Sequence, residues 1–333
     1  MPINYNEPLV KVDNLKKYFP VKSNIFSRAT GYIHAVDGLN FEIMPGKSMG
    51  LVGESGCGKT TTGKMLVRLH DPTEGEIYLQ NQDGVLENIA YRKGARLKTF
   101  RRNVQMIFQD PYESLNPRHT IYDIVAEPLS VQGIGTLVER QERVADLLNV
   151  VGLTPAETFM FRFPHELSGG QRQRVAIARA LIIEPKFIVA DEPTSMLDVS
   201  IRIGVMQLMA DLADRFGVSY LYITHDLAVA RYMTQEIGVM YLGKMVERAD
   251  TEELLKNPLH PYTKALLAAT PVPDPRFGRD EIIIKGGISK PVDPEPRCRF
   301  YERCPISDDF CYENPHPPLE DKGGGHYAAC YKV

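Results

Sequence analysis

A glycine-rich segment that ends in lysine and threonine carries the clearest chemical signal in the chain. It reads Gly53-Glu54-Ser55-Gly56-Cys57-Gly58-Lys59-Thr60, the G-x-x-x-x-G-K-[ST] spacing of a phosphate-binding loop. The glycines let backbone N–H groups turn inward toward phosphate oxygens, and Cys57 is expected to be only a small filler. We expect Lys59 to contact the β- and γ-phosphates, Thr60 to ligate Mg²⁺, and Thr61 to donate to the α-phosphate. The alternative is a glycine-rich turn that binds no ligand.

Two acidic residues follow an apolar run about 130 residues later. The run Phe187–Ala190 predicts a buried strand, and Asp191 and Glu192 come directly after it. At a strand end, Asp191 can hold Mg²⁺ through water, and Glu192 can polarise an attacking water as a general base. A strand that ends in two acids is often only structural, but its position after a phosphate loop favours the catalytic interpretation.

A third segment offers free backbone donors. Leu167-Ser168-Gly169-Gly170-Gln171 stands at the start of a predicted helix, Gly169–Ile183. The first N–H groups of a helix have no internal acceptor and can bind an anion. The alternative reading of Ser168 is a plain helix cap.

In this context the chain resembles the ABC family of ATPases. LSGGQ followed by QRVAIARAL is similar to the ABC signature motif, and Ser195-Met196-Leu197-Asp198 resembles the D-loop, with Met196 where Ala or Gly is usual. The resemblance extends to Gln109 in MIFQDP as the Q-loop glutamine near Mg²⁺, His225 in ITHD as the switch histidine, and Tyr18 as the aromatic that stacks on adenine.

The resemblance implies a site completed by two subunits. Glu192, Gln109 and His225 would act catalytically beside the phosphate loop of one subunit, and Mg²⁺ would be held by Thr60, Gln109 and Asp191. The partner would close the site with its own Ser168, Gly169, Gly170, Gln171 and Asp198. The insert Asp110–Pro128 is the expected contact with a transmembrane partner.

The elements between these motifs alternate between strand and helix. Apolar runs predict strands at Leu9–Val12, Leu39–Ile43, Ser48–Gly53 and Val218–Ile223, and helical spacing predicts helices at Gly58–Leu69 and Gln141–Val151. Pro20–Ile33 is expected to be an irregular polar insertion, and Phe100–Phe163 to be mainly helical. Such alternation predicts an α/β fold with a mostly parallel sheet. The resemblance adds the P-loop NTPase fold of an ABC nucleotide-binding domain, with an antiparallel β subdomain and a helical signature subdomain at about residues 110–185.

Composition limits the functional classes. The 333 residues are 43% hydrophobic and carry a formal net charge of -3, so there is no general basic field for nucleic acid, and no nucleic-acid partner is expected. No stretch approaches the ~18 apolar residues of a membrane span, and Met1–Val10 does not resemble a secretory signal. We therefore expect a cytosolic protein, and the resemblance to ABC transporter ATPases implies that other chains hold it, as a peripheral protein, at the cytoplasmic face of the cell membrane.

The C-terminal third narrows the resemblance. Tyr241-Leu242-Gly243-Lys244-Met245-Val246-Glu247, HPYTKALL from His260, CRFYERCPISDDFC and the final HYAAC are similar to ATPase subunits of oligopeptide/dipeptide ABC importers. That implies a second ABC ATPase subunit, identical or related, two transmembrane permease subunits, and an extracellular or periplasmic substrate-binding protein. The expected cargo is di- or oligopeptides; oligosaccharides and nickel complexes are the alternatives.

Four of the five cysteines, Cys298, Cys304, Cys311 and Cys330, lie in the last 36 residues. In a cytosolic protein such a cluster indicates a metal site before disulfides. Their wide spacing suits a 4Fe-4S cluster, which the resemblance also implies; Zn²⁺ is the alternative, with free thiols or disulfides after it. His316 and His326 are expected to be bystanders.

The predicted domains are therefore 1–270, the nucleotide-binding domain, and 271–333, a small Cys-rich domain with a regulatory or metal-cluster role, separated by the proline-rich stretch Thr270–Pro296. Competing functions are weaker. A translation ATPase carries two cassettes and a repair ATPase carries long coiled coils, whereas this chain has one phosphate loop and no sustained heptads. An exporter should lack the cysteine tail, and a non-catalytic subunit should lack Glu192, His225 or LSGGQ.

Overall fold

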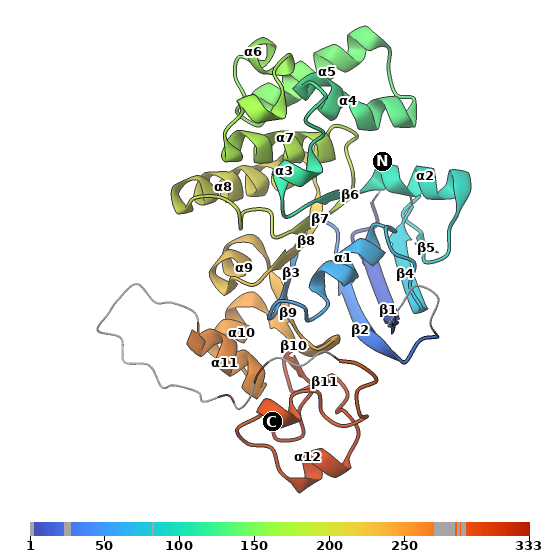
Figure 1. Cartoon of the computed structure of the whole chain (residues 1–333), viewed down its shortest axis with the longest axis vertical. Helices are drawn as coiled ribbons and strands as arrows, with labels where there is room; N and C mark the ends of the chain where they lie inside the picture. The colour runs from blue at the N-terminus through green and yellow to red at the C-terminus, as the bar shows by residue number, and fades with distance from the viewer. Residues whose placement is uncertain (1–2, 23–27, 82, 270–283, 285–286, 288–290) are drawn as a thin grey trace. The chain divides into compact units, whose positions relative to one another are not determined.

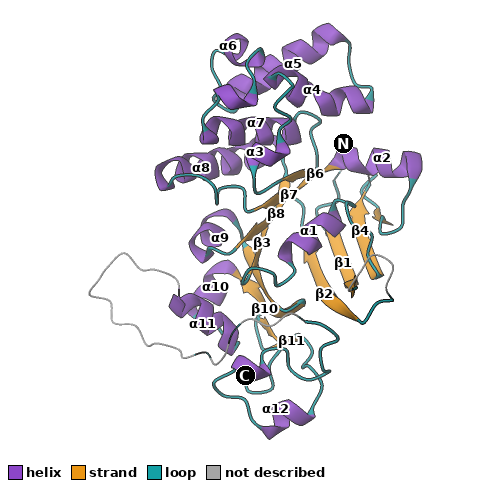
Figure 2. Cartoon of the chain, viewed as in Figure 1, coloured by secondary structure: helices purple, strands orange, loops and turns teal. Residues whose placement is uncertain are grey.

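A computed structural model describes residues 3–22, 28–81, 83–269, 284, 287 and 291–333. These residues form two compact units. The first combines Met1–Ile43, Lys47–Ala90 and Tyr222–Val333, and the second combines Met44–Gly46 and Tyr91–Leu221. Strand β8 (Ser219–Thr224) runs from the second unit into the first. Figure 1 follows the chain from blue to red, and Figure 2 separates its helices from its strands.

The first unit contains an antiparallel sheet. Its strands, in the order β2-β1-β4-β5, are β2 (Gly31–Ile43), β1 (Val10–Val21), β4 (Glu74–Gln80) and β5 (Leu86–Asn88). The resemblance predicted such a subdomain, and it is confirmed. The irregular insertion expected at Pro20–Ile33 is wrong only at its ends, because β1 runs to Val21 and β2 begins at Gly31, and these two residues lie opposite each other. Residues 23–27 between the strands lie outside the described residues.

A second sheet of the first unit carries the phosphate loop. Strand β3 (Met49–Val52) pairs in parallel with β9 (Glu236–Tyr241), which pairs antiparallel with β10 (Lys244–Asp250). Two short C-terminal strands, β12 (Tyr327–Ala328) and β11 (Glu320–Asp321), continue it beyond β10. The helices of this unit are α1 (Lys59–Leu66), α9 (Leu227–Met233), α10 (Thr251–Lys256), α11 (Pro261–Ala269), the short 3₁₀ helix η2 (Tyr301–Arg303) and α12 (Asp309–Glu313).

The second unit is mainly helical, as predicted, with one pair of parallel strands. Strand β6 (Val104–Ile107) runs beside β7 (Phe187–Asp191). The helices are α2 (Gly94–Asn103), α3 (Pro111–Ser114), α4 (Ile121–Gln132), α5 (Leu137–Val150), α6 (Ala156–Met160), η1 (Pro164–Glu166), α7 (Gly169–Leu181) and α8 (Val199–Phe216). Sequence patterns missed β6, because four residues directly after a helix are too short to show a period of their own.

The cysteine-rich tail does not form the separate small domain that the sequence suggested. Phe300 is 1% exposed and packs edge-on against Tyr241, with ring centroids 5.1 Å apart, and near Tyr262 at 5.4 Å. The tail strand β12 also pairs with β10. One buried aromatic and a strand pairing therefore merge the tail with the unit that carries the phosphate loop. Most of the proline-rich stretch Thr270–Pro296 lies outside the described residues.

Among the described residues, no helix is both long enough and apolar enough to cross a membrane.

Candidate functional site

The phosphate loop has the strand–turn–helix form that its sequence predicted. Strand β3 ends at Val52, and helix α1 begins at Lys59 with Gly58 as its N-cap. The Lys59 ammonium folds back into the loop, donating to the carbonyl oxygens of Gly53 at 2.7 Å and Glu54 at 3.0 Å. Arriving phosphates can take over these donors, since an ammonium offers three of them to any acceptor in reach.

Two glycines of the loop are required by their surroundings. A Cβ on Gly53 would lie 2.2 Å from the Met240 carbonyl oxygen, and one on Gly58 would lie 2.1 Å from the Ala35 carbonyl oxygen. Both have positive φ, 149° and 111°, where a side chain is strained in any case. Backbone from β9 and β2 thus supports the loop from outside.

Cys57 is buried, and its burial raises the pKa of the thiol. A protonated thiol is a poor nucleophile, which fits the predicted role of a filler. Its carbonyl oxygen accepts an N–H from Gly243, 2.9 Å away. The turn between β9 and β10 therefore also holds the loop.

Tyr18, the predicted adenine-stacking residue, lies on β1 in the same unit. Its ring stacks on His34 with centroids 4.0 Å apart, and His34 directly precedes Ala35, the residue that touches Gly58. The Tyr18 hydroxyl donates to Asp37 at 2.7 Å. Burial and this bond to a carboxylate raise the pKa of Tyr18 above its ordinary range. One face of the ring is therefore covered by an imidazole.

The predicted acidic pair lies in the second unit. Asp191, the last residue of β7, is 3% exposed. Glu192 follows at φ 45°, a left-handed conformation that costs a non-glycine residue energy and is found disproportionately at functional sites. The Gln109 amide donates to the Glu192 carboxylate at 3.2 Å. Two residues that the sequence assigned to catalysis are thus in direct contact.

The signature segment is both a helix cap and an exposed helix start. Ser168 is the exposed N-cap of α7; its hydroxyl accepts from Gln171 N–H at 3.3 Å, and the Gln171 side chain accepts from Ser168 N–H at 3.0 Å. This reciprocal pair is a capping box. The box satisfies two backbone N–H groups at the N-terminus of α7, where the helix also carries its partial positive charge.

The two remaining predicted residues stand at element junctions. His225 is exposed between β8 and α9, whose N-cap is the next residue, Asp226. Asp198 is exposed at the start of α8 and makes no side-chain cap bond there. The helix is therefore capped by Asp226 and not by His225.

Comparison with known proteins supplies the decisive observation. Residues 36–195 match the family model of the ABC transporter, and residues 246–311 match that of the oligopeptide/dipeptide transporter, C-terminal region. The oligopeptide transport ATP-binding protein AppF of Bacillus subtilis is 46% identical over 98% of this chain and 97% of its own. The chain belongs to the ATP-binding proteins of oligopeptide/dipeptide ABC transporters.

Further relatives of this ABC ATP-binding protein agree. The dipeptide transport ATP-binding protein DppF of Haemophilus influenzae is 44% identical over 99% of the chain and 98% of its own length. A solved dimeric structure of MJ0796, a bacterial ABC transporter cassette, is 31% identical with a TM-score of 0.63 and covers 73% of this chain and 98% of that one. The P-loop NTPase fold predicted from the sequence is therefore confirmed.

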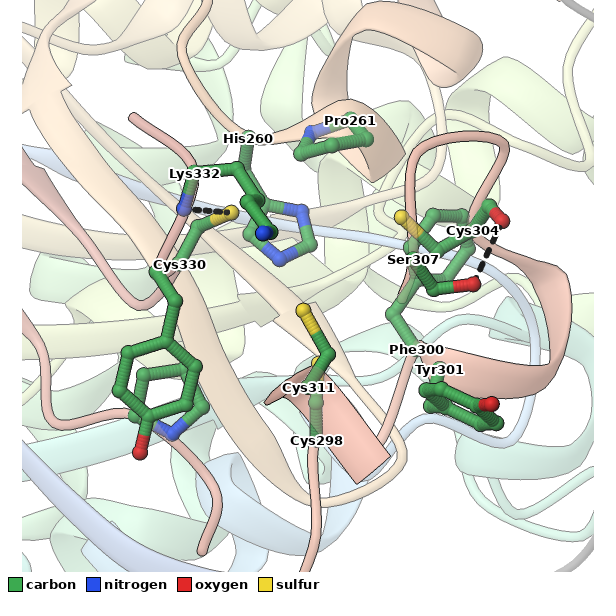
Figure 3. A pocket seen from close by; sticks show the side chains of 12 residues that line it. His260, Pro261, Cys298, Phe300, Tyr301, Cys304, Ser307, Cys311, Cys330 and Lys332 are labelled. Atoms are coloured by element: carbon green, nitrogen blue, oxygen red, sulfur yellow. Dashed lines mark hydrogen bonds between the residues drawn. The ribbon is translucent and has the colours of Figure 1, made fainter. Parts of the chain in front are cut away.

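The four tail cysteines of the ABC protein line one pocket. Cys298, Cys304, Cys311 and Cys330 border it, together with His260 and Lys332 (Figure 3). Burial raises the pKa of Cys298 to about 11, and burial also raises the pKa of Cys304 and Cys311. All four are free thiols.

The structure gives no support for the metal site expected at these cysteines. In the part of the chain that the structure describes, no three His, Cys, Asp or Glu residues are grouped so that they could hold a metal ion. A Zn–S bond of ≈ 2.3 Å requires tetrahedral sulfurs about 3.8 Å apart. The thiols border a shared hollow instead of converging on one point. His316 and His326 make other contacts, with the Arg299 N–H and with Glu247.

Sequence reasoning missed several contacts that hold the phosphate loop. Arg303 pairs with Glu54 of the loop, the Tyr262 hydroxyl accepts the Glu54 N–H, and Arg299 pairs with Asp37. Arg299, Arg303 and Tyr262 stand in segments that carry the family resemblance, in which the sequence assigned a chemical role only to the cysteines. Partners up to 262 residues apart in the chain leave no local pattern.

Proposed function

We propose that this chain hydrolyses ATP as one half of an ABC dimer and so drives uptake of di- or oligopeptides through two membrane permease subunits. The observation that carries the proposal is the phosphate loop closed around Lys59, in a chain that matches peptide transport ATP-binding proteins over nearly its whole length. The names of those relatives support the peptide cargo.

Within one subunit the proposed roles follow from position. Lys59 and the inward N–H groups of its loop bind the phosphates, with Thr61 donating to the α-phosphate. Glu192 orients the attacking water and accepts its proton, and Gln109, 3.2 Å away, positions that carboxylate. His225 donates a hydrogen bond to an oxygen of the transferred phosphoryl group, where negative charge develops. Mg²⁺, held by Thr60 and Asp191, would neutralise phosphate charge.

The other half of each site comes from the partner subunit in this proposal. The start of α7, with the exposed Ser168 followed by Gly169 and Gly170, offers helix N–H groups to the γ-phosphate bound across the interface. ATP bound by both subunits then stabilises the dimer, because a ligand favours the state that binds it. Loss of the γ-phosphate removes this link and opens the dimer.

The remaining partners follow from the family. Two transmembrane permease subunits would receive the motion through the insert Asp110–Pro128, which contains α3 and the start of α4. An extracellular or periplasmic substrate-binding protein would deliver the cargo. These partners place the chain, as a peripheral subunit, at the cytoplasmic face of the cell membrane.

The cargo is tested in the assembled transporter. The chain is co-expressed with its permeases, purified as the complex and reconstituted with its binding protein. We expect binding protein loaded with peptide to raise ATP hydrolysis, and oligosaccharide or Ni²⁺ to leave it unchanged. Stimulation by either alternative in place of peptide would reassign the cargo while keeping the ATPase.

We also propose a 4Fe-4S cluster in the cysteine pocket. The backbone suits a sulfur ligand at Cys330, which accepts an N–H from Lys332 at 3.4 Å. Such N–H bonds favour thiolate. Thiols that border a hollow without converging also suit a wide cluster better than one Zn²⁺. A cluster would supply a covalent staple to a segment with few apolar residues.

Anaerobic purification tests the cluster. We expect about four iron atoms per chain and visible thiolate-to-iron absorbance, both lost in Cys311→Ser. The control is Cys57→Ser, which removes the thiol of the phosphate loop and should keep the iron. A chain without iron and without visible absorbance, or one that holds stoichiometric zinc, contradicts this assignment.

A further inference from the structure

An ion pair joins the cysteine-rich tail to the phosphate loop. The two terminal nitrogens of Arg303 donate to the two carboxylate oxygens of Glu54, at 2.7 and 2.9 Å. The side chains are 10% and 22% exposed, so water screens the pair weakly. Bidentate arginine–carboxylate pairs fix direction as well as distance. Glu54 is the second residue of the loop, and its position therefore depends on a residue 249 positions away.

A tyrosine holds the same loop residue by its backbone. The Tyr262 hydroxyl accepts the N–H of Glu54 at 2.8 Å. The Tyr262 ring is buried between Tyr241, at 4.7 Å between centroids, and Phe300 of the tail, at 5.4 Å. Both the side chain and the main chain of Glu54 are thus anchored on the layer of aromatic side chains that the tail completes.

The other end of this connection is the cysteine pocket. Arg303 closes the 3₁₀ helix η2 and directly precedes Cys304, whose N–H bonds to the Tyr301 carbonyl at 3.2 Å. A change in how Cys304 is held must therefore shift η2. A second arginine, Arg299, directly follows Cys298 and likewise pairs with a carboxylate near the predicted ATP site. Its partner is Asp37, 2.5 Å away, which also accepts the Tyr18 hydroxyl.

We propose that Arg303 is a positioning residue for nucleotide binding. Through Glu54 it sets the backbone of the phosphate loop. A change in how the tail cysteines are held therefore changes the affinity of the loop for ATP. This inference rests on the proposed ATP site, which it extends by a regulatory input.

The physical reason is preorganisation. The loop binds phosphates through N–H groups that must already point inward, and any freedom they have is lost on binding. Ser55 and Gly56, next to Glu54, are exposed, so they receive little restraint from packing. Without its partner, the Glu54 carboxylate would turn toward water and release the start of the loop. The Lys59 ammonium would shift as well, because it donates to the Glu54 carbonyl oxygen.

A double-mutant cycle tests the pair. The full chain is prepared as wild type, Arg303→Met, Glu54→Gln and the double variant, and the Kd of a non-hydrolysable ATP analogue is measured by calorimetry. We expect each single variant to weaken binding about 10-fold, the size expected for a charge-assisted pair. The Kd of the double variant should be no higher than that of the single variant with the lower affinity. Effects that simply multiply would overturn the coupling.

Arg297→Met is the matched control. Arg297 lies in the same segment, pairs with Glu295 and Glu302 and stacks on Tyr312, but it has no contact with the loop among the interactions of the described residues. We expect its Kd to equal that of wild type, and amide hydrogen exchange of the loop to rise only in Arg303→Met. Equal loss of affinity in both arginine variants would mean that general loosening of the tail is responsible.

The cysteine input is tested by Cys304→Ser in two backgrounds. It should weaken analogue binding in wild type and have no further effect in Arg303→Met, because the connection is already broken. The same factor in both backgrounds would overturn the proposed route. A wild-type chain that binds no nucleotide would refute the ATP site itself, a failure distinct from a chain that binds ATP with an uncoupled pair.

Discussion

Replacing Glu192 by glutamine should leave a protein that binds ATP but hydrolyses it about 10²-fold more slowly or worse. A positioned general base contributes typically 10²–10⁴-fold to a proton transfer, and an amide cannot accept the proton. Binding should survive because glutamine has nearly the same shape, and its oxygen can still accept the Gln109 amide that now lies 3.2 Å from the carboxylate. Single-turnover hydrolysis measures the loss, and calorimetry measures the affinity.

The matched control is Glu184→Gln. Glu184 precedes the same strand, is exposed, and also has a positive φ, 53° against 45° for Glu192. It should hydrolyse ATP as wild type does. In the proposed dimer, Glu192→Gln should also accumulate an ATP-bound dimer, visible by light scattering in the presence of the membrane partners. Near-normal turnover by Glu192→Gln would remove that residue from the role.

Local spacing was enough to predict the elements that bear the ATP motifs. Strand β3, the loop and α1 are consecutive in the chain, so glycine positions and an apolar run specify them together. The capped start of α7 was readable for the same reason, since a capping box spans four residues. The predicted contact of Gln109 with the catalytic region rested on resemblance, because 83 residues separate it from Glu192.

Contacts between distant segments decided what the sequence could not predict. The tail was expected to stand apart because it is polar and follows a proline-rich stretch, yet the single side chain of Phe300 inserts it among Tyr241 and Tyr262. The length of β1 and β2 also depends on distant contacts, because residues of one strand are stabilised by the residues opposite them on the other, as Val10 is by Ile43. Charge pairs such as Arg303 with Glu54 have no periodicity to detect.

The support of the phosphate loop from outside leads to the second large effect, the loss of ATP binding in Gly58→Ala. The new methyl group would lie 2.1 Å from the Ala35 carbonyl oxygen, a backbone atom of β2 between the paired residues His34 and Val36, at a φ of 111°. A strained backbone conformation costs about 1–3 kcal/mol, and each 1.4 kcal/mol is tenfold in affinity. We therefore expect the Kd for ATP to rise roughly 10- to 100-fold, with further loss from the contact.

Gly56→Ala separates strain from contact. Gly56 also has a positive φ, 79°, but a Cβ there would meet nothing within 4 Å. It should therefore bear the conformational cost alone and bind ATP more tightly than Gly58→Ala does. Circular dichroism and thermal melting establish that both variants fold. Equal losses in the two would mean that β2 does not support the loop, whereas wild-type affinity in Gly58→Ala would mean that ATP binds elsewhere. The ordering of the two affinities thus measures how far the strand beside the loop, and not the loop sequence alone, determines nucleotide binding.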